Sequence, residues 1–285
     1  MRIGRRDLLR AGAVFGAAAL TGCTTQLDGT PVPATTPPPG QPLPGTVRLG
    51  VAEYRPYAFE DDAGELTGEV VEVVRAICEK LGSSLTVRAV PYETILENVE
   101  SGELDVVGGL SIRSKNCASL DFTAPDHLSL TAIVVRAGNP KGINTFTEVA
   151  STRARLGVVA NALEADNAQA AGVTGLRTYQ SSEELVQAVL EDQVDCAAYD
   201  DITLRDLLPA YAGLELRPPF EPVGGAPRYG FGFRKGDDSG LREAFDVVLR
   251  NLHASGEWLR ITKPFGFTRS NLPDAERVGE EACAR

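Results

Sequence analysis

The chain has 285 residues, a formal charge of −11 at neutral pH and a hydrophobic fraction of 43%. This length and hydrophobic fraction suffice for one large domain or two modest lobes, and they exclude disorder for most of the chain. The negative charge argues against nucleic-acid binding, because no dense basic patch is present that could offset repulsion from a phosphate backbone.

The N-terminal segment has the pattern of a cleaved export signal. Two adjacent arginines at positions 5 and 6 precede an apolar run over residues 11–20, which is too short to span a bilayer permanently. The run ends in the sequence LTGC, which resembles the bacterial lipobox, and the arginine pair resembles a twin-arginine signal. We therefore expect a signal peptide over residues 1–22. Cys23 is then the lipidated first residue of an exported protein anchored at the outer face of the cytoplasmic membrane.

A proline-rich segment follows over residues 23–45. Seven of the chain's 18 prolines fall between Thr24 and Gly45, a composition that favours extended polyproline II structure over packing. At about 3.1 Å per residue such a segment reaches up to roughly 70 Å. We interpret it as a tether that carries a globular body starting at residue 46.

From residue 46 onward, strand-like and helix-like segments alternate. The expected elements are a strand over 47–51, a helix with its apolar face within 70–81, a strand over 85–90, a helix around 95–99 and a strand over 104–107. This order predicts a βαβαβ unit with a parallel sheet.

The same order of elements restarts after the turn at residues 138–140. The second series comprises a strand over 155–159, a helix over 162–171, a strand over 176–179, a helix over 183–190 and a strand over 194–199. We expect a last strand over 229–234 and a helix over 241–253 to rejoin the first sheet. Two sheets imply two lobes, lobe 1 with residues 46–137 and 229–285 and lobe 2 with residues 138–228.

Several motifs resemble the polar amino-acid family of ABC-transporter solute-binding proteins, family 3. They are GVAEYRPYAF at 50–59, LTGE at 66–69 and GELD at 102–105. The motifs GNPK at 138–141, LGVVA at 156–160, GFGFRK at 230–235 and KPFGFT at 263–268 are most similar to the ectoine/hydroxyectoine-binding branch. The resemblance implies a type II periplasmic-binding-protein fold, with two α/β lobes joined by a two-stranded hinge near residues 136–141 and 224–230. The ligand then lies in the interlobe cleft.

Tyrosines are the first candidate ligand contacts. Ligands of open α/β sheets sit beyond the carboxyl ends of strands, which is where Tyr54, Ser111 and Asp200 fall. The resemblance also places Tyr57 and Tyr92 at ligand-stacking positions, where a ring face stabilises a delocalised cation by about 0.5 to 2 kcal/mol. The alternative is that these rings, together with Phe59, are core aromatics.

An acidic pair ends the strand expected over 194–199. The resemblance places Asp200 where amino-acid binders carry the carboxylate that pairs with the ligand ammonium. The ectoine branch usually has no acid there, which favours an α-amino acid or another cation. In the alternative interpretation the pair has a simple N-cap role, and Asp201 caps the helix that follows.

The carboxylate side departs from the family pattern. In GLSIRSKN at residues 109–116, the glycine and serine are Gly109 and Ser111, but Asn116 stands where the family has its ligand-binding arginine. Arg113 either supplies the same bidentate charge from three residues earlier or is an ordinary solvated charge. The backbone amides of Asn161 and Ala162, which open a helix, would also favour a carboxylate.

Four cysteines remain besides Cys23. The ectoine branch has one cysteine shortly after the binding loop and one at the terminus, and this resemblance implies a disulfide between Cys117 and Cys283. Cys78 on an apolar helix face and Cys196 within a strand are interpreted as buried free thiols.

The expected function is capture of a small zwitterion, either an ectoine-type compatible solute or a polar amino acid, and its delivery to the permease of an ABC importer. We expect a monomer without cofactor or metal. The alternatives are an enzyme on the same scaffold, resembling dehydratases or lytic transglycosylases, and a ligand-sensing partner of a membrane receptor. Catalysis is disfavoured because the two histidines, His127 and His253, have no metal-ligand spacing and only Glu53 is a suspect acid near the cleft.

Overall fold

The computed structural model describes residues 43–160, 162–222, 225–273 and 283. The expected signal peptide, the lipidation site at Cys23 and most of the tether lie outside the described residues, and so does Asn161. Within the described ranges, no helix combines the length and the apolar character that crossing a bilayer requires.

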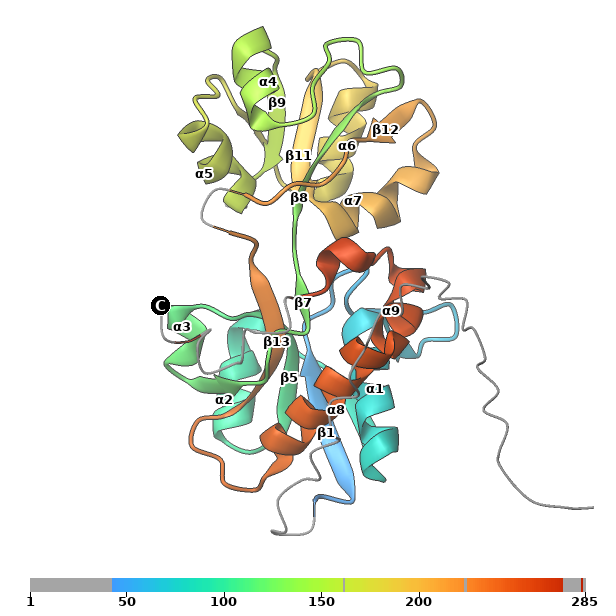
Figure 1. Cartoon of the computed structure of the whole chain (residues 1–285), viewed down its shortest axis with the longest axis vertical. Coiled ribbons are helices and arrows are strands. Elements are labelled where there is room, and N and C mark those ends of the chain that lie inside the picture. Colours follow the sequence, from blue (N-terminus) through green and yellow to red (C-terminus); the bar gives the residue numbers. More distant parts are fainter. Residues whose placement is uncertain (1–42, 161, 223–224, 274–282, 284–285) are drawn as a thin grey trace, which may run out of the picture. The chain divides into compact units, whose positions relative to one another are not determined.

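The first sheet has the strand order β4-β1-β5-β13-β6, with β7 paired to β13 (Figure 1). Strand β1 (Thr46–Val51) runs parallel to both β4 (Ser84–Ala89) and β5 (Val106–Ser111). Helices α1 (Glu69–Leu81) and α2 (Ile95–Glu100) connect these strands, so the predicted βαβαβ unit is confirmed. The antiparallel strands are β13 (Arg228–Arg234), β6 (Leu120–Phe122) and β7 (His127–Leu128).

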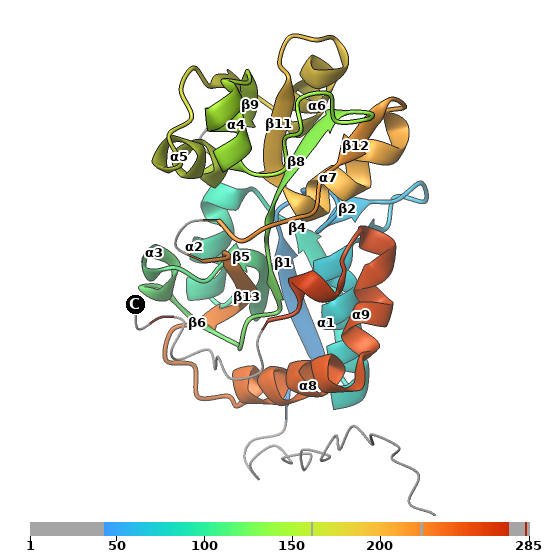
Figure 2. The same ribbon diagram turned by 45° about the horizontal axis from the view of Figure 1, so that its top comes forward.

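The C-terminal helices return to the first sheet, as predicted. Helices α8 (Leu241–Ser255) and α9 (Glu257–Thr262) lie beside α1 in Figure 2. Their apolar faces place Phe245 and the fully buried Trp258 in one core with β1 and α1. A ring of this size buries 150 Å² or more, on the order of several kcal/mol of hydrophobic free energy.

The second sheet has the strand order β10-β9-β11-β8-β12. Its parallel strands are β9 (Leu156–Val159), β10 (Arg177–Tyr179) and β11 (Cys196–Asp200), and its antiparallel strands are β8 (Thr131–Arg136) and β12 (Leu214–Leu216). The helices of this part are α4 (Phe146–Thr152), α5 (Leu163–Ala170), α6 (Ser182–Leu190) and α7 (Asp201–Leu207). Strands and helices therefore alternate as the sequence predicts.

Strand β8 corrects the predicted lobe boundary and hinge. Residues 131–136 pair with β11 and β12 of the second sheet, so the chain leaves the first sheet before Thr131 and not after residue 137. The physical reason is that TAIVVR is buried on both faces for its first five residues, and such a strand needs partner strands on both edges. The return crossing falls between Phe220, which bridges to Thr131, and Arg228.

The start of the globular body also differs from the prediction. Leu43 packs against the core of the first sheet, and the hydroxyl of Ser83 donates to the carbonyl oxygen of Pro44 at 2.8 Å. Leu43 and Pro44, within the segment expected to be tether, therefore pack on the body, because an apolar residue there contacts the edge of an existing core.

Short elements complete the described chain. They are β2 (Phe59–Glu60), β3 (Leu66–Thr67), α3 (Ser114–Cys117) and four 3₁₀ turns at Tyr92–Thr94, Leu208–Ala210, Lys263–Phe265 and Arg269–Asn271. Cys117, the last residue of α3, is joined to Cys283 by a disulfide with a Cα–Cα distance of 5.6 Å. This is the pair that the family resemblance implied. Cys78 and Cys196 are buried free thiols.

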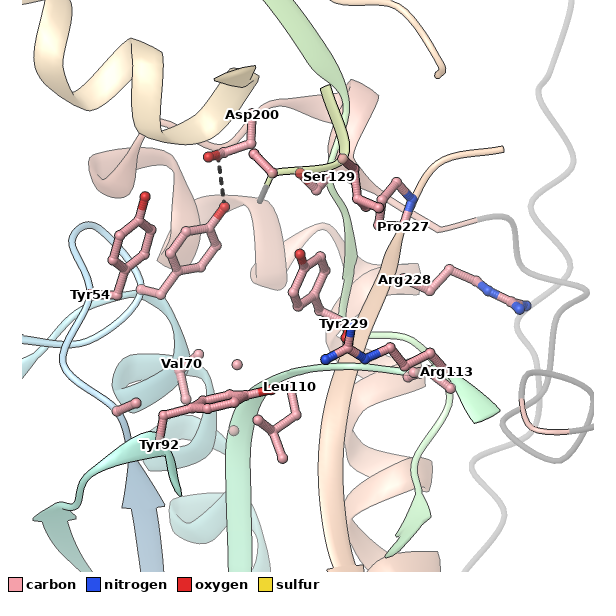
Figure 3. Close-up of a pocket in the computed structure, with 18 of the residues that line it drawn as sticks. Tyr54, Val70, Tyr92, Leu110, Arg113, Ser129, Asp200, Pro227, Arg228 and Tyr229 are labelled. Carbon is pink, nitrogen blue, oxygen red and sulfur yellow. Dashed lines mark hydrogen bonds between the residues drawn. The ribbon is translucent and has the colours of Figure 1, made fainter. Parts of the chain in front are cut away.

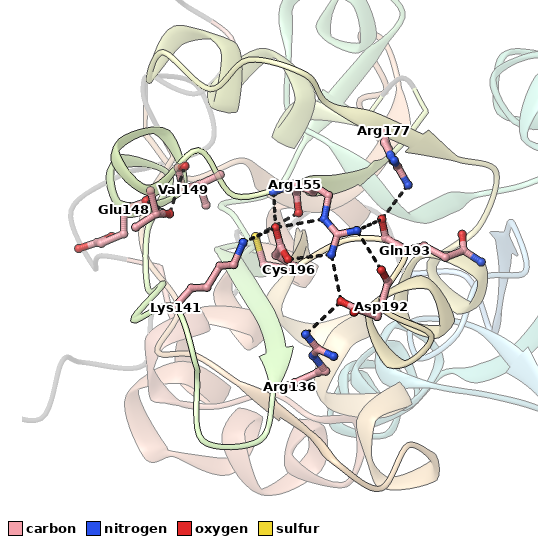
Figure 4. A network of polar contacts seen from close by, with 11 residues as sticks. Arg136, Lys141, Glu148, Val149, Arg155, Arg177, Asp192, Gln193 and Cys196 are labelled. Atoms are coloured by element: carbon pink, nitrogen blue, oxygen red, sulfur yellow. Dashed lines mark hydrogen bonds and ion pairs between the residues drawn. The ribbon is translucent and has the colours of Figure 1, made fainter.

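A polar network stabilises the amino ends of β9 and β11 (Figure 4). The guanidinium of Arg155 contacts Asp195 at 2.9 Å and Asp192 at 3.0 Å, and Lys141 contacts Asp195 at 2.8 Å. Hydrogen bonds from Arg155, opposed by partial burial, lower the pKa of Asp195 well below its usual range. The network lies at the opposite strand ends from Asp200, so it supports the sheet without touching the site described below.

Candidate functional site

A cavity of about 710 Å³ is lined by residues of both sheets (Figure 3). Of the nine ligand contacts predicted from the sequence, eight line it, and Asn161 lies outside the described residues. These eight residues are Tyr54, Tyr57, Tyr92, Gly109, Ser111, Arg113, Ala162 and Asp200. The structure therefore brings together side chains that the sequence spreads over almost 150 positions.

Strand ends explain why these residues meet. β5 ends at Ser111 and β11 ends at Asp200, while Tyr54 follows the end of β1. Carboxyl ends of parallel strands lie at one edge of a sheet, where helices cannot cover them. Glycines open the floor of the cavity, since a Cβ at Gly108 would lie 2.2 Å from Val70 and Gly109 has a left-handed φ of 73°.

Tyrosine hydroxyls connect the two sheets across the cavity. The hydroxyls of Tyr54 and Tyr199 are 2.8 Å apart, and the hydroxyl of Tyr57 donates to the Oδ1 atom of Asp200 at 3.0 Å. Tyr54 and Tyr57 stack with ring centroids 6.0 Å apart. Tyr54 and Tyr92 keep 43% and 51% of their surface exposed, so both rings retain area for a ligand.

Phe59 does not line this cavity. It lies beside a separate hollow, where the guanidinium of Arg55 covers its ring at 3.7 Å from the centroid. Its edge-to-face contact with Phe265, at 6.4 Å, attaches the β2–β3 hairpin to the C-terminal segment. Phe59 is therefore a packing residue.

Asp200 combines the two roles considered for it. It is the N-cap of α7, where its Oδ1 atom accepts a hydrogen bond from the backbone N–H of Thr203 at 2.8 Å, and it also lines the cavity. Burial raises the pKa of its carboxyl, although the hydrogen bonds from Thr203 and Tyr57 oppose the shift. A carboxylate held in this way favours a cationic ligand that replaces lost solvation.

Asp201 has a structural role, and the expectation that it caps α7 is wrong. Its side chain is fully buried. Its Oδ1 atom accepts from the backbone N–H of Leu130 at 3.0 Å, and its Oδ2 atom accepts from Asn271 at 3.1 Å and contacts Arg205 at 2.6 Å. It therefore fastens α7 to the crossing segment before β8 and to the C-terminal 3₁₀ turn.

Arg113 and Asn116 have different surroundings. The guanidinium of Arg113 points toward the interior of the cavity, whereas that of Arg228 points away (Figure 3). Asn116 is buried outside the cavity, and its Nδ2 group donates to the carbonyl oxygen of Ser111 at 2.8 Å. Arg113, the fifth residue of the GLSIRSKN motif, is therefore the cation of this motif that faces the cavity.

The sequence reasoning missed several lining residues. Among them are Ser129, Thr131, Glu164, Tyr199 and Tyr229. Glu164 stands in the first turn of α5, directly after Ala162 and Leu163, so the predicted helix start was a usable signal for it. Tyr229 and Thr131 gave no such signal, because the strand pairings that bring them to the cavity connect distant parts of the chain.

A buried polar cluster lies directly behind the cavity wall. The ring of His127 stacks on Tyr57 at 5.6 Å and on Tyr229 at 5.0 Å. Its Nδ1 atom is 3.1 Å from Asp126 and 3.8 Å from Glu69. Within the described chain, these three side chains form a group with donor atoms close enough to hold a metal ion. This group was not predicted, because the spacing of the histidines in the sequence gives no indication of it.

A shared proton accounts for the same cluster. Burial, then the neighbouring Asp126, raises the pKa of Glu69 well above its usual range. The pKa of Asp126 shifts in the other direction. Burial alone would raise it, but the hydrogen bond with His127 and the neighbouring Glu69 lower it below its usual value. Asp126 also accepts from the Nε1–H of Trp258 at 2.8 Å. Both carboxyl oxygens of Glu69 and the Nε2 atom of His127 are buried without a hydrogen-bond partner. A protonated, neutral Glu69 lowers the cost of burying these atoms, and we assign no metal to the cluster.

The fold and the cavity define the class of the protein. Two α/β lobes connected by two chain crossings, with a ligand-sized cavity at the strand ends, form the type II periplasmic-binding-protein fold. The chain belongs to the bacterial extracellular solute-binding proteins, family 3, whose profile matches residues 47–268.

Individual relatives agree with this assignment. A probable amino-acid ABC transporter periplasmic-binding protein, y4tE of Sinorhizobium fredii, is 24% identical over 254 residues, 84% of this chain and 83% of the relative. The crystal structure of EhuB in complex with hydroxyectoine is 26% identical, with a TM-score of 0.59 over 84% of this chain and 94% of that chain. An ancestral arginine-binding protein bound to arginine is 26% identical, with a TM-score of 0.58 over 78% and 99%.

These relatives are extracytoplasmic binding proteins and not enzymes. The chain is accordingly an extracellular-type solute-binding protein, and the relative from Sinorhizobium fredii is named as the binding protein of a probable amino-acid ABC transporter. The resemblance to family 3 inferred from the motifs is confirmed, and the solved EhuB structure supports the likeness to the ectoine branch.

Proposed function

We propose that this protein is an exported lipoprotein that captures a small zwitterion in the cavity and delivers it to the permease of an ABC importer. One observation carries the proposal, namely the separation of charge across the cavity. Asp200 lies toward one end of the site and Arg113 toward the other (Figure 3), and Tyr54, Tyr57 and Tyr92 line the same cavity.

The acidic side suits an ammonium or a delocalised cation. Tyr54 and Tyr92 offer ring surface to a cation, and the carboxylate of Asp200 neutralises it. Because the hydroxyl of Tyr57 already donates to Asp200, the carboxylate is oriented before the ligand arrives. Such preorganisation reduces the entropy lost on binding.

The basic side suits a carboxylate. The guanidinium of Arg113 can form two parallel hydrogen bonds to it, and helix α5, whose N-cap Ala162 lines the cavity, presents the positive end of its dipole there. A cavity of about 710 Å³ is within the usual range for small ligands. Solutes named for the relatives, hydroxyectoine and arginine, carry both charges and are candidate ligand types.

Delivery follows from the position of the ligand between two sheets. A solute that contacts Asp200 on the second sheet and Arg113 on the first stabilises the arrangement in which both contacts are made. We propose that the importer recognises this arrangement. We also propose that the lobes correspond to the two sheets with their helices, and that the two crossings described above act as the hinge.

A thermal-shift screen of ectoines, betaines and amino acids tests the proposal. A ligand at 100 times its dissociation constant raises the free energy of unfolding by about 2.7 kcal/mol. We expect at least one zwitterion to produce such a shift in the wild type and a smaller one in Asp200→Asn. If no zwitterion stabilises the protein at millimolar concentration, the proposed ligand class is wrong.

A further inference from the structure

A second carboxylate lies in the same cavity. Glu164, in the first turn of α5, lines the cavity together with Asp200 and is only 8% exposed. Its Oε1 atom accepts a hydrogen bond from the hydroxyl of Thr131 at 3.3 Å. Among the described residues, the neutral hydroxyl of Thr131 is the side-chain donor to Glu164, and no positively charged side chain forms an ion pair with Glu164.

The surroundings of Glu164 disfavour its charge in the empty cavity. Burial, together with repulsion from Asp200, raises the pKa of Glu164 to about 7. Both carboxylates also act on the phenols of Tyr199 and Tyr229, which places the two acids around one space. A buried carboxylate without a cationic partner is costly, and a positive ligand group would relieve this cost.

An ordinary helix-terminal role explains the position less well. Acids in the first turn of a helix interact favourably with its dipole, and they are usually solvated. Asp166, in the same turn, follows this rule, since it is exposed and does not line the cavity. Glu164 points into the ligand space instead.

The charged side chains of the cavity leave an excess of negative charge. Among the described lining residues, the carboxylates are Glu53, Glu164 and Asp200, and the guanidinium groups are Arg113 and Arg228. Arg228 points away from the cavity in Figure 3. A ligand with two cationic groups and one carboxylate balances these charges better than a neutral zwitterion does.

We propose that Glu164 determines specificity: with Asp200 it forms a two-carboxylate subsite that selects solutes carrying a second cationic group beyond the ammonium. This inference rests on the proposed function and narrows it to basic amino acids over neutral zwitterions. Asp200 holds the ammonium, Arg113 holds the carboxylate, and Glu164 receives the side-chain cation.

The pH dependence follows from the same arrangement. The other charged groups lining the cavity are Glu53, Arg113, Asp200 and Arg228, and of these Asp200 acts on the pKa of Glu164. The neighbouring phenols of Tyr199 and Tyr229 keep their protons because burial raises their pKa. A cation binds the ionised form of Glu164, so protonation competes with binding below the pKa of about 7. Affinity for a basic amino acid should fall about tenfold between pH 8 and pH 6. Affinity for a neutral zwitterion should change much less.

Two isosteric ligand pairs test the proposal by calorimetric titration. L-Arginine and L-citrulline have nearly the same shape and differ in side-chain charge, and L-lysine and L-2-aminoheptanoic acid provide a second pair of different length. We expect the wild type to prefer the charged member of at least one pair by about 10- to 100-fold. Glu164→Gln should remove this preference mainly by weakening the charged member, and the matched control Asp166→Asn should retain it.

The outcomes separate this inference from the proposed function. Equal affinity for both members of each pair, or an unchanged preference in a folded Glu164→Gln protein, overturns the role of Glu164 while solute binding stands. Binding of ectoine but of neither basic amino acid has the same meaning. If no amino acid or ectoine binds at all, the proposed function itself fails. Thermal unfolding of each variant verifies that it is folded.

Discussion

At the scale of single residues, the site depends on where one positive charge stands in a short motif. Arg113 faces the cavity, whereas Asn116 is buried and donates to Ser111. The backbone of Arg113 is extended, with φ −143° and ψ 158°, and it precedes the short helix α3. Arg113 is therefore the residue that can reach a ligand carboxylate, and Asn116 supports the loop that carries it.

Arg113→Ala should weaken binding of the solute found in the screen by on the order of 2 to 5 kcal/mol, about 30-fold or more. The reason is that the substitution leaves the ligand carboxylate without its charged partner in the cavity. Calorimetric titration measures the change. A loss below about 1 kcal/mol, typical of exposed ion pairs, would mean that the ligand carboxylate binds elsewhere.

Asn116→Ala should behave differently from Arg113→Ala. It removes a buried donor and leaves the carbonyl oxygen of Ser111 without its partner. We expect a loss of about 1 to 3 kcal/mol in the free energy of unfolding, with a much smaller change in affinity than for Arg113→Ala. Urea denaturation and calorimetry of the two variants side by side distinguish support of the loop from contact with the ligand.

The buried pair of Glu69 and Asp126 makes a prediction about pH and stability. Because the pKa of Glu69 is raised in the folded protein, its contribution to stability is fully present below about pH 4.3, its unfolded pKa. That contribution is lost as the pH rises toward the pKa of Glu69 in the folded protein. Asp126 has a lowered pKa, so its contribution is lost only in more acidic solution, outside this window.

Glu69→Gln should therefore gain stability relative to the wild type as the pH rises from 5 to 8. The variant keeps a neutral donor beside Asp126 and has no proton to lose. Urea denaturation at both pH values measures the effect, and Glu164, which titrates in both proteins, cancels in the comparison. A variant that is equally destabilised at pH 5 and pH 8 would exclude proton sharing, and metal analysis of the purified protein would then test the cluster as a cation site.

At the scale of elements, periodicity predicted most of the fold. The apolar spacing within residues 70–81 corresponds to α1, in which Val70, Val74 and Ile77 are buried. Such local patterns are set by neighbours along the chain. The sheet to which a strand belongs is set by distant partners, which is why Thr131–Arg136 was recognised neither as a strand nor as part of the second sheet.

The candidate site was predictable to a similar extent. Tyr54, Ser111 and Asp200 stand at strand ends, and the rule for α/β sheets is sufficient to bring them together. The helix start indicated the position of Glu164, but the burial of Glu164 and Tyr229 depends on tertiary packing, which no local pattern reports. Asp200 and Asp201 are adjacent in sequence, yet only the three-dimensional structure reveals that the first lines the cavity and the second is buried among packing contacts.

The disulfide gives a prediction about α3 and Cys283. Cys117 and Cys283 are separated by 166 residues, and cross-linking so long a loop restricts the unfolded chain strongly. Replacing both with Ser should lower the free energy of unfolding by about 2 to 5 kcal/mol. Reductant should lower the melting temperature of the wild type and leave that of the double variant unchanged. Equal sensitivity of both proteins to reductant would contradict a stabilising role.

At the scale of the whole molecule, the described body separates support from recognition. Asp201, Arg205 and Asn271 fasten helix α7 of the second lobe to the C-terminal segment beside the first. The lining carboxylates Asp200 and Glu164 have neutral hydrogen-bond donors, such as Tyr57 and Thr131, and so stay available to a cation. Asp201 is therefore fully engaged in packing, whereas Asp200 joins the two sheets through Tyr57 and also lines the cavity.

The last prediction concerns the anchor, which lies outside the described residues. The LTGC sequence ending at Cys23 follows an apolar run too short to span a bilayer, so we expect Cys23 to be lipidated and the globular body to be held at the membrane through its proline-rich segment. Lipid modification with more than one acyl chain gives stable anchoring, whereas a single chain is marginal. Cys23→Ala should therefore move the protein from the membrane fraction to the soluble fraction, while Cys78→Ala should leave it in the membrane. Immunoblots after a carbonate wash measure the distribution, and retention of the Cys23→Ala protein in the washed membranes would show that something other than a lipid on this cysteine holds it there.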